Sequence, residues 1–144
     1  MDPVEEQLTQ SKVIAVVGLS PNPERDSYDV ARYLQAQGYK IIPVNPTVDE
    51  VLGEKSYPDL KSVAEPVDMV DIFRRSEAVP PLVDEALEIG AKYIWMQLEI
   101  VHEEAAKKAT EAGVLVVMDR CTMREHSGRY GSLPSEQRPP YLSS

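Results

Sequence analysis

The residues from 13 to 35 are the ones whose types and spacing best suit ligand binding. An apolar run, VIAVV, leads into Gly18, and the polar residues Ser20, Asn22 and Arg25 follow before a helical pattern begins. Glycine lets the chain turn tightly and lets a ligand approach the backbone. Amides at a helix N-terminus favour a phosphate, and a guanidinium adds a cation. The stretch predicts a phosphate-binding loop, although a single glycine is equally compatible with a stiff loop that binds nothing.

Two prolines, Pro21 and Pro23, stand where many nucleotide-binding loops carry further glycines. One glycine is enough for close approach to a phosphate, and a turn fixed by proline loses less conformational entropy on binding. The end of the next apolar run reads PVNPT, so it offers Asn45 and Pro46. An NAD site normally has Asp or Glu there to hold the ribose hydroxyls. The pattern therefore disfavours NAD.

No catalytic or metal-binding set of side chains emerges from the sequence. Cys121 is close in sequence to Arg120 and Arg124, and neighbouring positive charges can lower the pKa of a thiol and make it redox-active. We favour the alternative, an unreactive thiol at a strand end. His102 and His126 are far apart and lack the spacing of metal ligands. Each histidine is expected to be a surface or capping residue.

The composition excludes several classes of partner. The chain has 144 residues, enough for one domain, and a formal net charge of -9. This charge argues against nucleic acid or an anionic membrane, whereas a small anionic ligand needs only a local group of amides and one or two cations. No apolar run approaches the roughly 20 residues that span a bilayer. The acidic N-terminus resembles no targeting signal and the single cysteine suits a reducing compartment, so we expect a cytoplasmic protein.

Five short apolar segments alternate with helical patterns, and the three clearest helices each end at a glycine. Most of the segments run apolar without alternation, as expected of strands that are covered on both faces. The order predicts an α/β, Rossmann-like, doubly wound fold with a mostly parallel five-stranded sheet and helices on both faces. The predicted strands are VIAVV (13–17), KIIPV (40–44), VDMVDIF (67–73), KYIWM (92–96) and VLVVM (114–118).

Several local features are also predicted. The segment VDMVDIF alternates partly, which places it toward an edge of the sheet. Asp26 or Ser27 is the expected N-cap of the first helix. Residues 45–66 are rich in turn-forming residues. Residues 128–144 lack periodicity and follow a domain of residues 1–127, so we expect a flexible tail or an arm that docks on a partner.

In sheets of this kind, ligands bind beyond the carboxyl ends of the strands, where the strand order reverses. Each predicted strand ends in a turn-forming or polar residue, which favours one common crevice. These ends are Gly18 to Ser20, Asn45 and Pro46, Arg74 and Arg75, Gln97, and Asp119 to Cys121.

Five motifs share an informative order and spacing, namely VVGLSPNPER, GYKIIPVNP, VDMVDIFRR, YIWMQ and VVMDRC. They resemble the small stand-alone CoA-binding proteins often labelled YccU-like, which are similar to the CoA-binding domain of the succinyl-CoA synthetase α subunit. The resemblance covers residues 6–126 and implies a Rossmann-type fold with coenzyme A as cofactor. It places the CoA phosphates at Gly18, Ser20, Asn22, Arg25, Ser27 and Tyr28, the adenosine end at Val44, Asn45 and Pro46, and the rest of the crevice along Phe73 and Arg74.

One position departs from the family pattern. Relatives commonly read W-x-Q-x-G after the fourth strand, whereas this chain has Glu99 at the place of the glycine. A carboxylate there would repel a phosphate and fill space near the crevice. Gln97 and Asp119 to Cys121 match family motifs, but the resemblance assigns them no contact.

The resemblance also limits the activity that we expect. Succinyl-CoA synthetase works through a second domain with a phosphorylated histidine and through a separate nucleotide-grasping subunit, and neither is evident here. We expect a protein that holds CoA or an acyl-CoA without catalytic machinery of its own, either as a homodimer or as a partner of an acyl-CoA enzyme. The alternatives are an NAD(P)-linked oxidoreductase and an interaction module whose crevice is vestigial.

Overall fold

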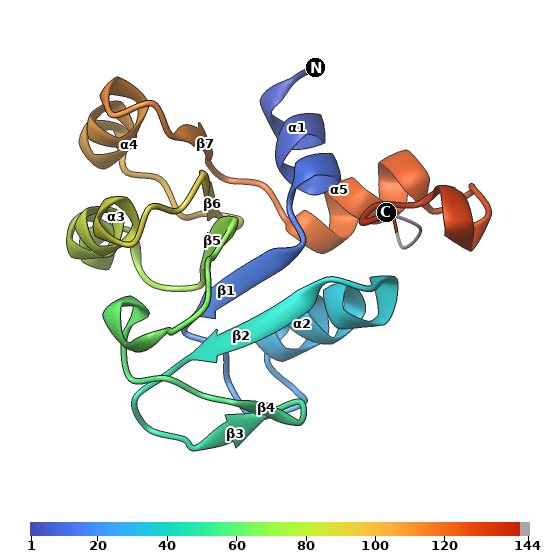
Figure 1. Ribbon diagram of the computed structural model, residues 1–144, viewed down its shortest axis with the longest axis horizontal. Coiled ribbons are helices and arrows are strands. Elements are labelled where there is room, and N and C mark those ends of the chain that lie inside the picture. Colours follow the sequence, from blue (N-terminus) through green and yellow to red (C-terminus); the bar gives the residue numbers. More distant parts are fainter. Residues whose placement is uncertain (142–144) are drawn as a thin grey trace.

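The computed structural model describes residues 1–141 and contains a five-stranded parallel sheet of order β2-β1-β5-β6-β7 (Figure 1). The predicted α/β, Rossmann-like fold is confirmed. The sheet strands are β1 (Val13–Val17), β2 (Lys40–Val44), β5 (Met69–Ile72), β6 (Tyr93–Met96) and β7 (Leu115–Val117).

Helices cover both faces of the sheet, as the sequence predicts. On one face lie α1 (Pro3–Gln10), α2 (Asp26–Gln37) and α5 (Thr122–Tyr130); on the other lie α3 (Val79–Glu88) and α4 (Glu103–Glu111) (Figure 1). The strands between them are buried on both sides, which explains their unbroken apolar sequences. Trp95 is fully buried in β6 and donates from its indole nitrogen to the Arg120 carbonyl oxygen at 2.8 Å. It is therefore a packing residue.

The first helix after β1 begins one or two residues earlier than the capping pattern predicts. Arg25 is the N-cap of α2, and its side chain makes no capping hydrogen bond. The predicted caps, Asp26 and Ser27, are the first two helical residues instead. Ser27 uses its hydroxyl oxygen to accept from the Ser20 amide at 3.0 Å, so it holds the preceding loop rather than the helix end.

The strand β5 lies in the middle of the sheet, between β1 and β6, so the prediction of an edge position is wrong. The polar residues that break its apolar pattern have internal partners. Asp71 is fully buried and accepts a hydrogen bond from Gln97. Asp68 accepts from the amides of Lys12 and Val13 at 2.9 and 3.0 Å. Partnered carboxylates of this kind fit a central strand.

The N-terminal helix α1 has no counterpart among the predicted elements. Asp2 caps it by accepting from the Glu5 amide at 2.8 Å, and Pro3 occupies the first helical position. Gln7 is fully buried and donates to the carbonyl oxygens of Ile94 in β6 and Leu115 in β7, at 3.1 and 3.2 Å. The helix therefore packs across two strands of the sheet.

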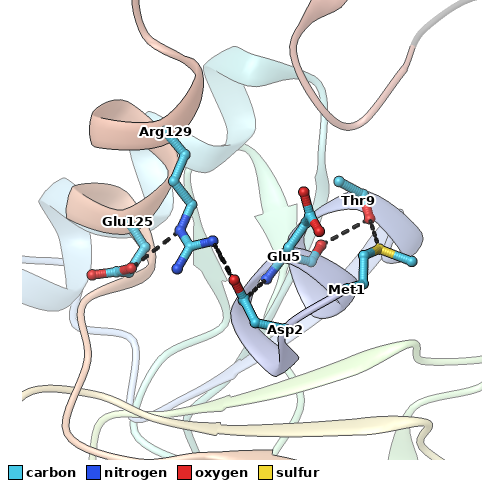
Figure 2. A network of polar contacts seen from close by, with 6 residues as sticks. All are labelled: Met1, Asp2, Glu5, Thr9, Glu125 and Arg129. Atoms are coloured by element: carbon cyan, nitrogen blue, oxygen red, sulfur yellow. Dashed lines mark hydrogen bonds and ion pairs between the residues drawn. The ribbon is translucent and has the colours of Figure 1, made fainter.

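An ion pair joins the N-terminus of α1 to α5. Arg129 of α5 contacts Asp2 at 3.0 Å and Glu125 at 3.3 Å, so the N-cap of α1 is tied to α5 (Figure 2). All three side chains are partly exposed, and such pairs contribute about 0.2–1 kcal/mol each. Their main effect is to orient α1 against α5.

The segment after residue 127 carries more structure than the sequence indicates. The helix α5 continues to Tyr130, across the predicted boundary between residues 127 and 128, and a 3₁₀ turn follows at Ser135–Gln137. His126, expected at the surface, is fully buried and is 2.7 Å from the Pro139 carbonyl oxygen and 2.9 Å from the Tyr33 hydroxyl. Burial lowers the pKa of His126. The expectation for this residue is wrong because the following segment folds back over it.

The turn-rich link between β2 and β5 holds a small antiparallel pair, β3 (Glu50–Val51) and β4 (Glu54–Lys55), and a 3₁₀ turn at Leu60–Ser62. Leu52 and Gly53 both have positive φ, which is typical of a two-residue hairpin turn. This hairpin is absent from the prediction because its strands have only two residues each.

Candidate functional site

The strand order reverses between β1 and β5, because the chain runs from β1 outward to β2 and then returns to β5 on the other side of β1. The carboxyl ends of these two strands therefore form the switch point, where ligands bind in doubly wound sheets. Gly18 follows β1 and Phe73 follows β5. The sequence places its candidate loop at this point.

Gly18 has a φ of 87° and forms a close contact with the neighbouring strand end. A Cβ atom at this position would collide with the carbonyl oxygen of Phe73 and lie 3.3 Å from the Arg74 guanidinium. The sequence assigns this glycine to the approach of a ligand. The structure gives another reason, because the backbone of Phe73 already fills the space that a side chain would need.

Internal hydrogen bonds shape the loop between Gly18 and α2. The Ser20 amide donates to Ser27 Oγ at 3.0 Å, and the Asn22 amide donates to Ser20 Oγ at 3.0 Å. The Glu24 amide donates to Asn22 Oδ1 at 2.9 Å. Ser20, Asn22 and Ser27 thus use acceptor atoms to hold the loop. These hydrogen bonds preorganise the loop, and the acceptor atoms that form them are less available to a ligand.

The first turn of α2 leaves backbone donors available. Among the residues that the structure describes, the amides of Asp26 and Ser27 make no backbone or side-chain hydrogen bond. These amides point along the N-terminal end of a 12-residue helix, where an anion is favoured. They border a surface hollow of about 560 Å³, which is lined by Gly18, Ser20, Glu24, Arg25, Asp26, Ser27 and Phe73.

A second hollow of about 280 Å³ lies at the carboxyl ends of β1 and β2, and its lining includes Val44, Pro46 and Arg74. Asn45, between the first two of these, donates from Nδ2 to the Leu19 carbonyl oxygen at 2.9 Å and fixes the loop after β1 to the loop after β2. Tyr28 packs against the apolar cluster beneath α2 and lines neither hollow. Most of the predicted site residues therefore line one of these two hollows, whereas Asn22, Asn45 and Tyr28 line neither.

A third hollow of about 160 Å³ continues past Phe73 toward the ends of β6 and β7. It shares Asp26 and Phe73 with the hollow at the first loop. Glu99 is exposed and does not line it, so its carboxylate stays outside the crevice. The lining residues are Asp26, Asp29, Val30, Phe73, Gln97, Leu98, Ile100, Cys121, Met123 and Arg124.

The position of Glu99 explains why a glycine fits there. Its φ is 67°, in the left-handed region that favours glycine. The Asp119 carboxylate, itself on a residue with a φ of 58°, accepts from the Glu99 amide at 2.7 Å. This bond between the loops after β6 and β7 holds Glu99 in its left-handed conformation.

Cationic side chains follow three strands of the sheet in an otherwise acidic chain, and one of them lines each hollow. Arginines follow β1, β5 and β7, and all are exposed. Within residues 1–141, no carboxylate forms an ion pair with any of them. Unpaired guanidinium groups at one sheet edge suit a ligand with several phosphates. These arginines are Arg25, Arg74, Arg75, Arg120 and Arg124.

Beneath the third hollow lies a buried polar network that the sequence does not reveal. Asp71 Oδ1 accepts from Gln97 Nε2 at 2.6 Å, and Gln97 Nε2 also donates to Thr122 Oγ1 at 2.9 Å. Burial raises the pKa of Asp71 to about 7, against the smaller lowering by the Gln97 and Thr122 hydrogen bonds. The one feature of the sequence that could have revealed this network is Asp71, an aspartate within the otherwise apolar strand β5.

The other candidate chemistry has a structural explanation. His102 caps α4, because its Nδ1 accepts from the Ala105 amide at 3.1 Å, as expected of a capping residue. In the part of the chain that the structure describes, no group of three or more potential ligands could hold a metal ion. Over the same residues, no helix has both the length and the apolar character needed to cross a membrane.

These features define a class of protein, namely a Rossmann-like α/β domain with hollows, exposed arginines and open helix amides at the carboxyl ends of its strands. The chain belongs to the CoA-binding domain family, whose model matches residues 12–127. Membership confirms coenzyme A as the cofactor. It also confirms the resemblance found in the five sequence motifs.

Two relatives match nearly full length. The uncharacterized protein YneT of Bacillus subtilis is 47% identical over 124 residues, which cover 86% of this chain and 92% of that protein. A hypothetical protein from Pyrococcus horikoshii has a solved structure with a TM-score of 0.85 and 42% identity, covering 89% of this chain and 92% of that one.

A third relative is much larger. The ADP-forming acetate–CoA ligase II of Archaeoglobus fulgidus is 32% identical over 83 residues. The match covers 56% of this chain but only 12% of the ligase. The similarity is thus confined to a small part of that enzyme.

Proposed function

We propose that this protein holds CoA or an acyl-CoA along the crevice at the carboxyl ends of β1, β2 and β5. The phosphates bind at the N-terminus of α2, beside the amides of Asp26 and Ser27 and the guanidinium of Arg25. The adenosine end lies in the hollow bordered by Val44 and Pro46. In this arrangement Asn45 positions the loop rather than contacting the ligand.

The observation that supports this proposal best is the set of five exposed arginines after β1, β5 and β7, none paired with a carboxylate within residues 1–141. Three of them, Arg25, Arg74 and Arg124, line the hollows. The protein carries a net charge of -9, and several of its lysines and its remaining exposed arginines have acidic partners elsewhere. CoA, with a diphosphate and a 3′-phosphate, matches this distribution of charge.

The first hollow also carries negative charge, from Glu24 and Asp26. Each carboxylate opposes a phosphate at this site, so the arginines and amides must outweigh them. Both carboxylates are on exposed residues, where water screens their repulsion. We therefore expect CoA affinity to fall with increasing salt, since the attractive charges are screened as well.

In this proposal the protein binds CoA but does not catalyse a reaction of its own. The buried polar groups Asp71, Gln97 and Thr122 are hydrogen-bonded to one another. The cofactor would thus be kept for, or delivered to, a separate acyl-CoA enzyme. The chain alone, incubated with CoA, acetate and ATP, is expected to form no acetyl-CoA above background. Formation of acetyl-CoA in proportion to protein concentration would refute this part.

Isothermal titration calorimetry tests the binding itself. CoA is expected to bind at one site per chain, and dephospho-CoA more weakly by about tenfold, because one phosphate and its charge-assisted contacts are lost. NADH should bind weakest of the three. It lacks the pantetheine arm, and the end of β2 has no acidic residue to bind its ribose hydroxyls. Equal or tighter binding of NADH would favour the oxidoreductase alternative. No heat and no thermal shift with any of the three would favour a vestigial crevice.

A further inference from the structure

The third hollow contains the chain's single cysteine. Cys121 is 6% exposed and lines the hollow together with Phe73, Gln97 and Met123. The volume, about 160 Å³, is several times the ~30 Å³ that one water occupies in the liquid. Because this hollow shares Asp26 and Phe73 with the one at the first loop, a ligand anchored by phosphates at α2 can extend into it.

A second residue of this hollow indicates what kind of ligand group enters it. Gln97 is 3% exposed, and its Nε2 donates to the two interior acceptors Asp71 Oδ1 and Thr122 Oγ1. This arrangement fixes the orientation of the amide. Within residues 1–141, no donor forms a hydrogen bond with the Gln97 Oε1. An unused acceptor on a residue that is more than nine-tenths buried therefore remains at the hollow, and it can accept from an N–H, O–H or S–H donor of a ligand.

The end of CoA that lies away from the nucleotide offers such donors, because it consists of amide N–H groups, short apolar stretches and a terminal thiol. We propose that this hollow receives the thiol end of CoA, and that Cys121 captures it as a mixed disulfide when the incoming ligand is CoA disulfide. The inference rests on the proposed function, since phosphates held at α2 direct the other end of the ligand past Phe73.

The reaction is an ordinary thiol–disulfide exchange. Cys121 loses its proton to solvent, and its Sγ attacks the nearer sulfur of CoA disulfide. A new S–S bond forms between Cys121 and one CoA, and the original S–S bond breaks. The second CoA leaves with the electron pair as a thiolate and takes up a proton. The Cys121 sulfur is oxidised, the departing sulfur is reduced, and a free thiol can reverse the reaction.

The mixed disulfide with Cys121 would be protected from reduction by thiols in solution. The bound sulfur would lie where Cys121 is only 6% exposed, so external thiols would reach it slowly compared with a surface disulfide. The crevice would then serve as a store from which CoA is released when thiols are abundant. An unreactive packing role for Cys121 is the alternative that the following experiment decides.

The test compares two disulfides on the full-length protein by intact mass spectrometry. CoA disulfide carries the nucleotide, whereas pantethine carries the same reactive end without it. We expect one CoA added per chain, formed about tenfold faster or more than the pantetheine adduct at equal concentration, because anchoring raises the local concentration of the disulfide. The chain has one cysteine, so any mixed disulfide is at Cys121.

Two variants complete the test. Cys121→Ser is expected to abolish the adduct, and Arg25→Glu to remove the rate advantage of CoA disulfide without changing the rate with pantethine. Equal rates for the two disulfides with wild-type protein, or no adduct at all, would overturn the inference. If Cys121→Ser still binds CoA in calorimetry while the wild type forms no adduct, only this inference fails. If CoA does not bind to either protein, the proposed function fails.

Discussion

The carbonyl oxygen of Phe73 lies in the space where a side chain on Gly18 would have to be. This contact joins the ends of β1 and β5 at the point where the strand order reverses. It makes the glycine a requirement of the fold as much as of the ligand. The crevice exists because these two strand ends approach each other so closely.

Replacing Gly18 by alanine should therefore destabilise the protein even without ligand. Two penalties combine, a φ of 87° and a collision with the backbone of Phe73, and together they should cost about 3 kcal/mol in free energy of unfolding. Urea denaturation measures this cost.

Gly113 provides a matched control, since it has the same φ of 87° but no heavy atom within 4 Å of the position that an alanine Cβ would take. Gly113→Ala should cost only the backbone term, about 1–2 kcal/mol. Similar losses for the two variants would show that the contact with Phe73 has no energetic weight.

Reversing the charge of Arg25 should weaken CoA binding by at least about tenfold, because a guanidinium beside the diphosphate becomes a carboxylate. Calorimetry measures the affinity. Arg32→Glu is the control, because it makes the same charge change about two turns further along α2, at an exposed residue that lines none of the three hollows and pairs with Asp29 at 3.3 Å. The control should change affinity by less than about threefold. If Arg25→Glu and Arg32→Glu weaken binding equally, the phosphates do not lie at the first loop.

The buried carboxyl of Asp71 predicts a pH dependence of stability. Its pKa in the folded protein is raised from 3.8 to about 7, so between these values the folded state holds a proton that the unfolded state has released. Stability from this group is therefore complete below about pH 4 and decreases as pH rises toward 7. Asp71→Asn keeps an acceptor for Gln97 and carries no charge, so this decrease should be absent.

The measurement is the difference in free energy of unfolding between wild type and Asp71→Asn at several pH values from about 4.5 to 8, the range over which the raised pKa acts. The difference should move steadily in favour of the variant as pH rises. His126 acts in the opposite direction, because its lowered pKa removes stability as pH falls, but it contributes equally to both proteins and cancels. A difference that is independent of pH would contradict the assignment.

Removing the C-terminal segment should change the stability of the protein but not its affinity for CoA. Ending the chain after Gly131 would remove the Pro139 carbonyl oxygen that contacts His126 at 2.7 Å and would expose the ring. Such a truncation should lower the free energy of unfolding by about 1–3 kcal/mol and leave CoA affinity within about twofold. Loss of CoA binding, or a change in oligomeric mass by light scattering, would instead assign this segment to the site or to a partner.

The sequence predicts the sheet well because its strands are apolar on both faces and each is followed by a turn or a polar residue. The position of the Gly18 loop follows from the same pattern. The order of the strands cannot be deduced in this way, and the predicted place of VDMVDIF is wrong. The partners of Asp68 and Asp71 come from the start of β1, from the residue after β6 and from the first residue of α5. Such partners are distant in sequence.

The limits at the site have a similar origin. A sequence gives residue types but not which polar atoms are already used. The family resemblance assigns Ser20, Ser27 and Asn45 to the ligand, and only the structure shows that their hydrogen bonds also hold the loops together. The free acceptor of Gln97 depends on two residues that are 26 and 25 positions away. The local sequence pattern therefore predicts neither the hydrogen bonds within the loops nor the free oxygen of Gln97.

The most direct test of the central claim is a crystal structure of the protein with CoA. We expect the diphosphate within hydrogen-bonding distance of the Asp26 and Ser27 amides and of the Arg25 guanidinium, with the thiol end directed past Phe73. CoA bound at any other surface, with the crevice between β1 and β5 empty, would contradict the account.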